Sequence, residues 1–367
     1  MIVILTQCFP SRVGGIETLM YNIALYLSYS NDVVVLADQQ NLKEDNIFDQ
    51  NEINFSTKRF RGIKFLRNRK KFNKLKKIHT SSKIDAVISD SWKSLEVTID
   101  FLKKNRIPVI SLAHGNEIII KNNKHHNRVR KILEYANAIV VNSNYTKSLL
   151  NKISNNFQNV KTIYPGINIK KNYIEENVSL NQGSPILLTL ARLEKRKGHV
   201  LILKSIMNLK KYFPNIQYII AGEGEGLNNI KNKIKEYNLQ DNVNLVGTVN
   251  ENQKNYIFSN TDLMIMPTLD ESSAKSIEGF GIAYIEAANF KIPSIASDVG
   301  GTPEAVIHNK TGLIIKGIDE LDQAIKSLID NKEKRLNLGQ NAKIRAENEL
   351  NWDIQIKKYN DLIKEIQ

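Results

Sequence analysis

Short apolar runs alternate with longer amphipathic stretches along the whole chain, and this alternation predicts the fold. The first run, Ile2–Thr6, precedes helical spacing over Ile16–Leu27. Further strand-like runs in the first half are Asp32–Ala37, Ile84–Ser89, Ile107–Leu112, Ala138–Asn142 and Val160–Tyr164, with helical spacing over Trp92–Lys104, Arg128–Tyr135 and Tyr145–Ile153. Short apolar strands separated by helices predict a parallel, doubly wound α/β sheet.

The same alternation restarts after Gly166–Ser184, a polar, Asn-rich segment that we interpret as a linker. Strand-like runs in the second half are Pro185–Ala191, Ile216–Ala221, Val243–Val246, Leu263–Met266, Pro293–Ala296 and Gly312–Ile315. The amphipathic stretch Lys332–Gln367 ends the chain, and Trp352 begins its last segment. A chain of 367 residues is too long for one ordinary core. We therefore expect two α/β domains, 1–168 and 180–350, with a cleft at the carboxyl ends of the two sheets.

Composition places the chain among globular proteins, with 41% hydrophobic and 25% charged residues. A single cysteine, Cys8, excludes a disulfide framework and is typical of a reducing compartment. No apolar run reaches the roughly 20 residues that span a bilayer. The run Met1–Leu5 is too short for a signal peptide and lacks a basic leader. We therefore expect a cytoplasmic protein, soluble or peripheral on the inner face of the cell membrane.

The net charge of +14 lies almost entirely in the first half, where Met1–Pro165 holds 26 Lys and Arg against 13 Asp and Glu. Lys58–Lys77 alone holds 11 basic residues and no acidic one. A helix beginning near Lys64 would place Phe65, Phe72 and Leu75 on one side. The basic candidates for membrane or acceptor contact are Lys64, Arg67, Lys70, Lys71 and Lys74. This pattern is typical of a helix on an anionic membrane, and a solvated basic face fits it equally well.

The segment Glu278–Glu286 (EGFGIAYIE) reads as a turn that opens a helix at Ile282. Gly279 and Gly281 allow close approach of the backbone to a ligand, and the N–H groups that open a helix suit a phosphate. The carboxylates of Glu278 and Glu286 could bind hydroxyl groups on either side of a bound diphosphate. A surface loop whose glycines only start the helix is the alternative.

Cationic residues follow the first strand of the second half, where Arg192 ends the strand and Lys197 precedes a helix. Arg offers a planar fork and Lys a point charge, and together they match a diphosphate. In the first half, Gly14-Gly15 follows the first strand and His114 ends another. A strand-end histidine could hydrogen-bond a ligand, although a lone histidine is as often structural. Neither His125-His126 nor any Asp-x-Asp cluster predicts a metal site.

Taken together and in order, these motifs resemble those of the retaining glycosyltransferases of family 4, which have the GT-B fold. The motifs are Gly14-Gly15, His114-Gly115, Arg192 with Lys197-Gly198, Ala221–Gly224, Val246-Gly247, Glu278–Gly281 with Glu286, and Gly300-Gly301 with Glu304. The likeness covers nearly the whole chain. It implies two Rossmann-like domains facing a central cleft, and a helix over 351–367 that crosses back to the first domain.

The resemblance also implies a role for each matching residue. Arg192 and Lys197 would hold the donor diphosphate together with the turn Gly279, Phe280, Gly281 and Ile282. Glu286 would bind the ribose hydroxyls and Glu278 those of the transferred sugar. The remaining implied contacts are Val246 and Gly247 near the base, His114 over the sugar, and Gly14 and Gly15 near the phosphate or the acceptor.

The sequence thus predicts a metal-independent hexosyltransferase without a cofactor, whose co-substrate is a UDP- or GDP-linked sugar. We expect a glycolipid or envelope-polysaccharide acceptor, and an anionic membrane surface as a further partner. The alternatives are a sugar-nucleotide epimerase or hydrolase of the same fold, and a basic nucleic-acid-binding protein. The last is the weaker one, because the chain has no zinc-ligand spacing, aromatic RNA-binding signature or basic-zipper heptads.

Overall fold

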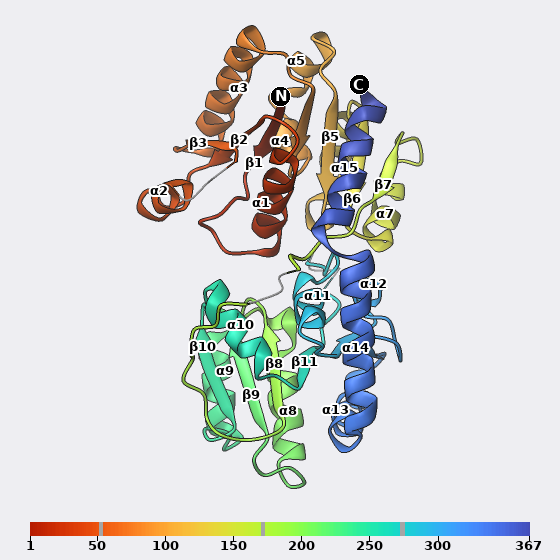
Figure 1. Cartoon of the computed structure of the whole chain (residues 1–367). Coiled ribbons are helices and arrows are strands. Elements are labelled where there is room, and N and C mark those ends of the chain that lie inside the picture. Colours follow the sequence, from red (N-terminus) through yellow and green to blue (C-terminus); the bar gives the residue numbers. More distant parts are fainter. Residues whose placement is uncertain (51–53, 170–172, 272–275) are drawn as a thin grey trace. The chain divides into compact units, whose positions relative to one another are not determined.

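The computed structural model describes residues 1–50, 54–169, 173–271 and 276–367 (Figure 1). Contacts divide the chain into two compact units. Unit 1 comprises Met1–Gly166 and Trp352–Gln367, and unit 2 comprises Ile167–Asn351. The described residues form one seven-stranded sheet in unit 1 and one six-stranded sheet in unit 2. All strand pairings in both sheets are parallel, which confirms the predicted α/β class.

The sheet of unit 1 has the strand order β3-β2-β1-β4-β5-β6-β7. Its strands are β1 Ile2–Thr6, β2 Val33–Asp38, β3 Ser56–Phe60, β4 Ala86–Ser89, β5 Val109–Ala113, β6 Ala138–Val141 and β7 Val160–Thr162. Its helices are α1 Gly15–Ser28, α2 Leu42–Gln50, α3 Lys64–Ser81, α4 Trp92–Leu95, α5 Ile99–Lys104, η1 Asn116–Ile118, α6 Asn123–Leu133, α7 Asn144–Asn151 and α15 Trp352–Ile366. Along β1, Ile2 and Ile4 enter one core while Val3 and Leu5 enter the other. A strand buried on both faces therefore reads as an unbroken apolar run.

The last helix, α15, packs against α1 within unit 1 (Figure 1). Trp352 and Tyr359 are buried in the same core as Leu19. The Trp352 ring stacks on Tyr26 with 5.8 Å between centroids. A Cβ on Gly166 would lie 2.9 Å from the Trp352 ring, so the chain leaves unit 1 directly beside the point where it returns.

The sheet of unit 2 has the order β10-β9-β8-β11-β12-β13. Its strands are β8 Ile186–Leu190, β9 Gln217–Ala221, β10 Val243–Gly247, β11 Leu263–Met266, β12 Ser294–Ser297 and β13 Gly312–Ile315. Its helices are η2 Lys195–Lys197, α8 His199–Leu209, α9 Leu227–Glu236, α10 Glu251–Ser259, α11 Ile282–Asn289, α12 Thr302–Ala305, η4 Ile318–Glu320, α13 Leu321–Asp330 and α14 Lys332–Glu349. An apolar core that includes Leu187, Ile202, Tyr218 and Ile265 joins the sheet to its helices.

Each sheet has one point at which the strand order reverses. Strand β1 lies between β2 and β4, and β8 lies between β9 and β11. In open parallel sheets, ligands bind outside the carboxyl ends of the strands at such a point. The loops that follow β1, β4, β8 and β11 are therefore the places where a site is expected.

The predicted linker Gly166–Ser184 includes the point where the chain changes units, and its described residues from Ile167 onward belong to unit 2. The chain passes from unit 1 to unit 2 at its first residues, between Gly166 and Ile167. Further on, the backbone N–H of Glu176 donates to the Asn252 carbonyl at 3.1 Å. The N–H of Asn181 donates to Asn244 Oδ1 at 2.7 Å. Polar residues here satisfy hydrogen bonds of unit 2, which composition alone cannot distinguish from solvation.

Three elements of unit 1 differ from the sequence pattern. The predicted helix Trp92–Lys104 is divided into α4 and α5. The sequence pattern did not predict helix α2 or strand β3. The exposed residues of α2 carry few apolar side chains, and so does the sequence STKRF of β3. Within the described residues, no helix is both long enough and apolar enough to cross a bilayer.

Candidate active site

The loop after β8 and the end of β11 lie in contact at the point where the order of sheet 2 reverses. Gly198, at the start of α8, has a φ of 76°, in the left-handed region that favours glycine. A Cβ at this position would lie 2.5 Å from the Pro267 carbonyl oxygen. The glycine thus allows the segment Arg192–Lys197 to approach the strand whose loop leads to Glu278.

Two buried cations share the carboxylate of Glu278. The distance from Glu278 Oε2 to Arg196 Nη1 is 2.7 Å, and that to Lys197 Nζ is 2.5 Å. Burial by itself raises the pKa of the Glu278 carboxyl, but Lys197 and Arg196 outweigh it and lower the pKa to about 2. Glu278 is therefore ionised and compensates one of the two cations, and Glu194 Oε2 lies 3.4 Å from Arg196 Nη2 as a second carboxylate.

Arg196 was not among the residues that the sequence singled out. It is one of three consecutive basic residues, Lys195, Arg196 and Lys197, of which Lys195 is exposed and the other two are buried. Arg192, the predicted partner of Lys197, instead has a side chain 62% exposed and pairs with Glu194 at 2.8 Å. The structure therefore brings together Lys197, Glu278 and Arg196, and does not join Arg192 to Glu278.

The turn before α11 contacts a second glycine pair, Gly300-Gly301. The Gly301 N–H donates to the Glu278 carbonyl at 2.9 Å, and a Cβ on Gly300 would lie 2.3 Å from the same oxygen. Gly281 adopts a φ of 99° where α11 begins. Phe280 is buried, so its side chain serves packing, while Gly279 is partly buried and Gly281 is buried at the helix start.

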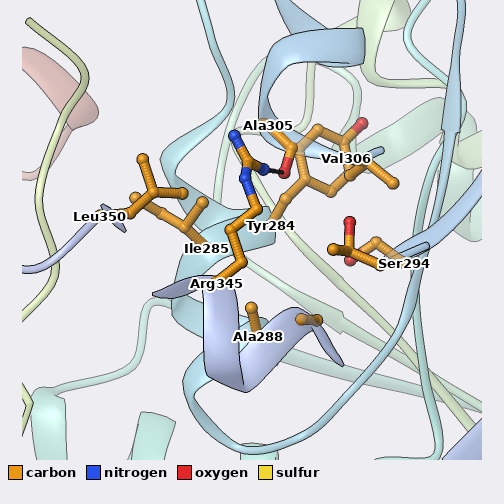
Figure 2. A pocket seen from close by; sticks show the side chains of 10 residues that line it. Tyr284, Ile285, Ala288, Ser294, Ala305, Val306, Arg345 and Leu350 are labelled. Carbon is orange, nitrogen blue, oxygen red and sulfur yellow. Dashed lines mark hydrogen bonds between the residues drawn. The ribbon is translucent and has the colours of Figure 1, made fainter. Parts of the chain in front are cut away.

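Figure 2 shows a small cavity between α11, α12 and α14. Its volume is about 10 Å³, roughly the space of one water molecule. Arg345 lies at its edge and donates to the carbonyls of Ala305 at 2.8 Å and Glu304 at 2.6 Å. The cavity is too small for a nucleotide, and Arg345 fixes the short helix α12 that follows the Gly300-Gly301 turn.

Glu286 lies on α11 and pairs with Lys254 of α10, with 2.6 Å between Glu286 Oε1 and Lys254 Nζ. Val246 and Gly247 end β10, the strand that precedes α10, and both are partly buried. Gly247 has a φ of 69°, and its carbonyl accepts from the Gly222 N–H at 2.7 Å. The predicted ribose and base contacts thus lie on neighbouring elements of unit 2.

In unit 1, Asp90 organises the loop after β1. Its Oδ2 accepts from the Gln7 N–H at 2.6 Å, from Thr6 Oγ1 at 3.0 Å and from the Cys8 N–H at 3.2 Å. His114 Nε2 lies 2.8 Å from the Asp90 carbonyl oxygen. Burial raises the pKa of the Cys8 thiol to about 12. Asp90 was overlooked, although it directly follows the predicted strand Ile84–Ser89 at its carboxyl end.

A carboxylate covers the glycine pair at the start of α1. A Cβ on Gly14 would lie 2.2 Å from Glu17 Oε2. Glu17 is buried and pairs with Arg12 at 2.9 Å. Arg12 compensates the charge of Glu17, so the pair leaves no net charge beside Gly14.

The basic helix α3 begins at Lys64, as expected, but its faces differ from the prediction. Lys71 is buried, donates to the Thr6 carbonyl at 2.5 Å and pairs with Asp38 at 2.6 Å. Arg67 pairs with the same carboxylate at 3.1 Å. Lys71 is therefore unavailable to a membrane, and Leu75 is buried whereas Phe65 is 63% exposed, so these two do not share an outer face.

The remaining basic candidates stay accessible. Lys64 and Lys70 are exposed and Lys74 is partly exposed. The exposed apolar side chains beside them are Ile63, Phe65 and Leu66. We call Ile63, Lys64, Phe65, Leu66 and Lys70 the α3 patch.

Two family models together match residues 13–345. The model described as Glycosyltransferase Family 4 matches residues 13–171, and the one described as Glycosyl transferases group 1 matches residues 170–345. The chain belongs to the family 4 glycosyltransferases. This assignment confirms the predicted family and an enzyme of glycosyl transfer, and it replaces the nucleic-acid-binding alternative.

Some relatives match this glycosyltransferase over nearly its whole length. A GDP-mannose-dependent monoacylated alpha-(1-6)-phosphatidylinositol monomannoside mannosyltransferase of Corynebacterium glutamicum is 22% identical over 98% of this chain and 97% of its own. The crystal structure of Anabaena Alr3699/HepE in complex with UDP has a TM-score of 0.79 and 17% identity over 99% of both chains. Sucrose-phosphate synthase from Thermosynechococcus elongatus has a TM-score of 0.80 and 19% identity over 100% of this chain and 98% of that one. These structures support the GT-B fold of the glycosyltransferase.

Proposed function

We propose that the chain transfers a hexose, with retention of configuration, from a UDP- or GDP-linked sugar to a glycolipid or envelope-polysaccharide acceptor. The name of the corynebacterial relative supports a GDP-linked donor and a lipid-borne acceptor. UDP in the Anabaena structure supports a uridine donor instead. The same site in unit 2 suits the diphosphate of either.

The observation that carries the proposal is the buried group of Arg196, Lys197 and Glu278 at the carboxyl ends of β8 and β11. When the bond from the sugar C1 to the diphosphate oxygen breaks, negative charge grows on the diphosphate. The three cations Arg192, Arg196 and Lys197 pair with only two carboxylates, Glu194 and Glu278, so one positive charge is left for it. The N–H groups that open α11 add further donors, so these groups would serve in place of a metal ion.

Glu278 is better suited to hydrogen-bonding the transferred sugar than to attacking it. Its carboxylate is bound to two cations and has a pKa lowered to about 2, and such an anion is a poor nucleophile. Retention would then follow from attack by the acceptor hydroxyl on the face that the diphosphate leaves. The predicted contacts of Arg192 with the diphosphate and of His114 with the sugar stay predictions.

A nucleotide panel tests the donor site. UDP, GDP, ADP and their sugar conjugates are added to the wild type and to Glu286→Ala, and the thermal unfolding midpoint is measured. We expect one nucleotide to stabilise the wild type, by about 3 kcal/mol at about 100 times its Kd, and the variant much less. Glu236→Ala, which removes an exposed carboxylate of the same unit, is the control.

Equal stabilisation of the wild type and Glu286→Ala by the same nucleotide would contradict the ribose assignment. Donor turnover that needs no acceptor would indicate the epimerase or hydrolase alternative. Turnover only with an added glycolipid or saccharide acceptor supports transfer.

We further propose that the α3 patch binds an anionic membrane at the cytoplasmic face. Exposed apolar side chains beside lysines suit the boundary between lipid head groups and acyl chains. We expect salt-sensitive binding to vesicles that contain anionic lipid, and Phe65→Glu is expected to weaken it about tenfold or more. Tyr212→Glu, which changes an exposed aromatic residue of unit 2, should bind like the wild type. Equal binding to neutral vesicles would contradict the membrane proposal.

A further inference from the structure

Glu286, the proposed ribose ligand, is held by a charged partner on another helix. Lys254 Nζ lies 2.6 Å from Glu286 Oε1 and 2.8 Å from Glu251 Oε1. The side chains of Lys254 and Glu286 are only 17% and 22% exposed, whereas Glu251 is 77% exposed. Ion pairs in such partly buried positions are screened less than those at the surface, so the pair with Glu286 is the stronger of the two.

The side chain of Lys254 stays protonated in this position. Burial by itself lowers the pKa of the ammonium, but the carboxylates of Glu286 and Glu251 outweigh it and raise the pKa above its ordinary value. Only one oxygen of Glu286 is engaged with Lys254. Among the residues that the structure describes, Glu286 Oε2 has no hydrogen-bond or ion-pair partner and is left as an acceptor.

Residues 173–176, which we call the strap, hold the helices of this pair together. At one end of the strap, the Tyr173 ring packs on Phe290, directly after α11, with 4.6 Å between centroids. The Asn289 amide at the end of α11 donates to Tyr173 Oη. The strap therefore begins on the helix that carries Glu286.

The other end of the strap binds α10. The Ile174 carbonyl accepts from Asn255 Nδ2 at 3.0 Å. The Glu176 carboxylate accepts from Asn250 Nδ2 at 2.8 Å and from Gln253 Nε2 at 2.9 Å, the two side chains of the α10 capping box. Since Gln253 directly precedes Lys254, the strap fixes the turn of α10 from which the lysine extends.

Glu286 without Lys254 would be a poor group to place near a nucleotide diphosphate. In a partly buried site, two negative charges at the distance of one ribose repel each other appreciably. Lys254 cancels the charge of Glu286 without occupying Oε2. A carboxylate oxygen that is fixed and charge-compensated can accept hydrogen bonds from two vicinal hydroxyl groups.

We propose that Lys254 is a positioning residue for nucleotide recognition, which fixes the Glu286 carboxylate so that Oε2 accepts from the 2′- and 3′-hydroxyls of the donor ribose. The strap keeps α10 and α11 at the spacing that this pair requires. The inference rests on the proposed function, because it assumes that Glu286 binds the ribose. It adds that recognition of the two hydroxyls depends on a lysine that need not touch the nucleotide.

Binding of a nucleotide with and without its ribose hydroxyls tests the inference. Isothermal titration calorimetry measures the affinity for the nucleotide that binds the wild type, UDP or GDP, and for its 2′,3′-dideoxy analogue. Both ligands are titrated into the wild type, Lys254→Met, Lys254→Arg and Glu286→Gln. We expect Lys254→Met to weaken binding of the natural nucleotide about tenfold and binding of the analogue less than about twofold. Lys254→Arg should restore most of the difference, and the KM for the donor should rise in Lys254→Met while kcat changes little.

The control is Glu251→Gln, which removes the exposed partner of Lys254 and should bind both nucleotides like the wild type. If Lys254→Met weakens both nucleotides equally, or neither, the positioning role is wrong. If Glu286→Gln binds both nucleotides like the wild type, the ribose assignment within the proposed function fails instead. A selective loss in Glu286→Gln without one in Lys254→Met overturns the role of Lys254 alone.

Discussion

The variant Glu278→Gln is expected to lower the free energy of unfolding by about 3–5 kcal/mol, because it leaves the buried Lys197 without a carboxylate and Arg196 with only Glu194, at 3.4 Å. Glutamine preserves the volume of the side chain and one acceptor oxygen, but not the charge that faces Arg196 and Lys197. Urea denaturation of the whole chain, monitored by circular dichroism, measures the difference. Glu236→Gln, at an exposed pair with Lys233, should stay within about 0.5 kcal/mol of the wild type.

The same argument predicts that a nucleotide diphosphate stabilises Glu278→Gln more than the wild type, since the ligand supplies the missing negative charge. Turnover of the variant should nevertheless fall, because the group proposed to hold the transferred sugar is changed. A variant that unfolds at the wild-type urea concentration would contradict the view that Glu278 compensates these cations.

The variant Lys197→Ala is expected to lose about 1–3 kcal/mol of transition-state stabilisation, which is about a fivefold to 150-fold fall in kcat/KM. The ammonium of Lys197 is fixed 2.5 Å from Glu278 and lies where the diphosphate would gain charge. Steady-state kinetics with the donor identified in the nucleotide panel measures the effect. Arg196 still pairs with Glu278 in this variant, so the fold should persist.

Lys195→Ala is the matched control, because Lys195 lies two residues away and is exposed. It should keep kcat/KM within about twofold of the wild type. Equal losses in Lys195→Ala and Lys197→Ala would mean that the general positive charge of the loop matters rather than a placed ammonium. An unchanged kcat/KM in Lys197→Ala would contradict the assignment of Lys197 to the site.

The sheets were predictable because their strands are buried on both faces. Runs such as Ile2–Thr6 and Leu263–Met266 are apolar without interruption, and the structure assigns the strands β1 and β11 to the same residues. Helix α2 and strand β3 could not be predicted in the same way, because they cover only part of the core. In β3 (STKRF), four of the five residues are polar, so the apolar signal is too weak.

The basic segments show what a sequence pattern leaves open. In Lys195–Lys197, three adjacent cations have the same chemistry, and only the contact with Glu278, 81 residues from Lys197, distinguishes the buried ones. In α3, Lys71 resembles Lys70 in the sequence but is buried because Asp38 lies at the end of β2. Burial of a charge depends on a partner that is distant along the chain, which local periodicity does not report.

The sequence by itself determined the class of the fold, the repeat of two α/β halves and the order of the glycine and acidic motifs, because these depend on local spacing. Only the tertiary structure decided which charges meet: Arg196 rather than Arg192 beside Glu278, Lys254 beside Glu286, and Glu17 over Gly14. It also decided that residues 173–176, within the predicted linker, bind two helices. Ion pairs and packing join residues far apart along the chain, and their partners are specified only when the strands and helices have assembled.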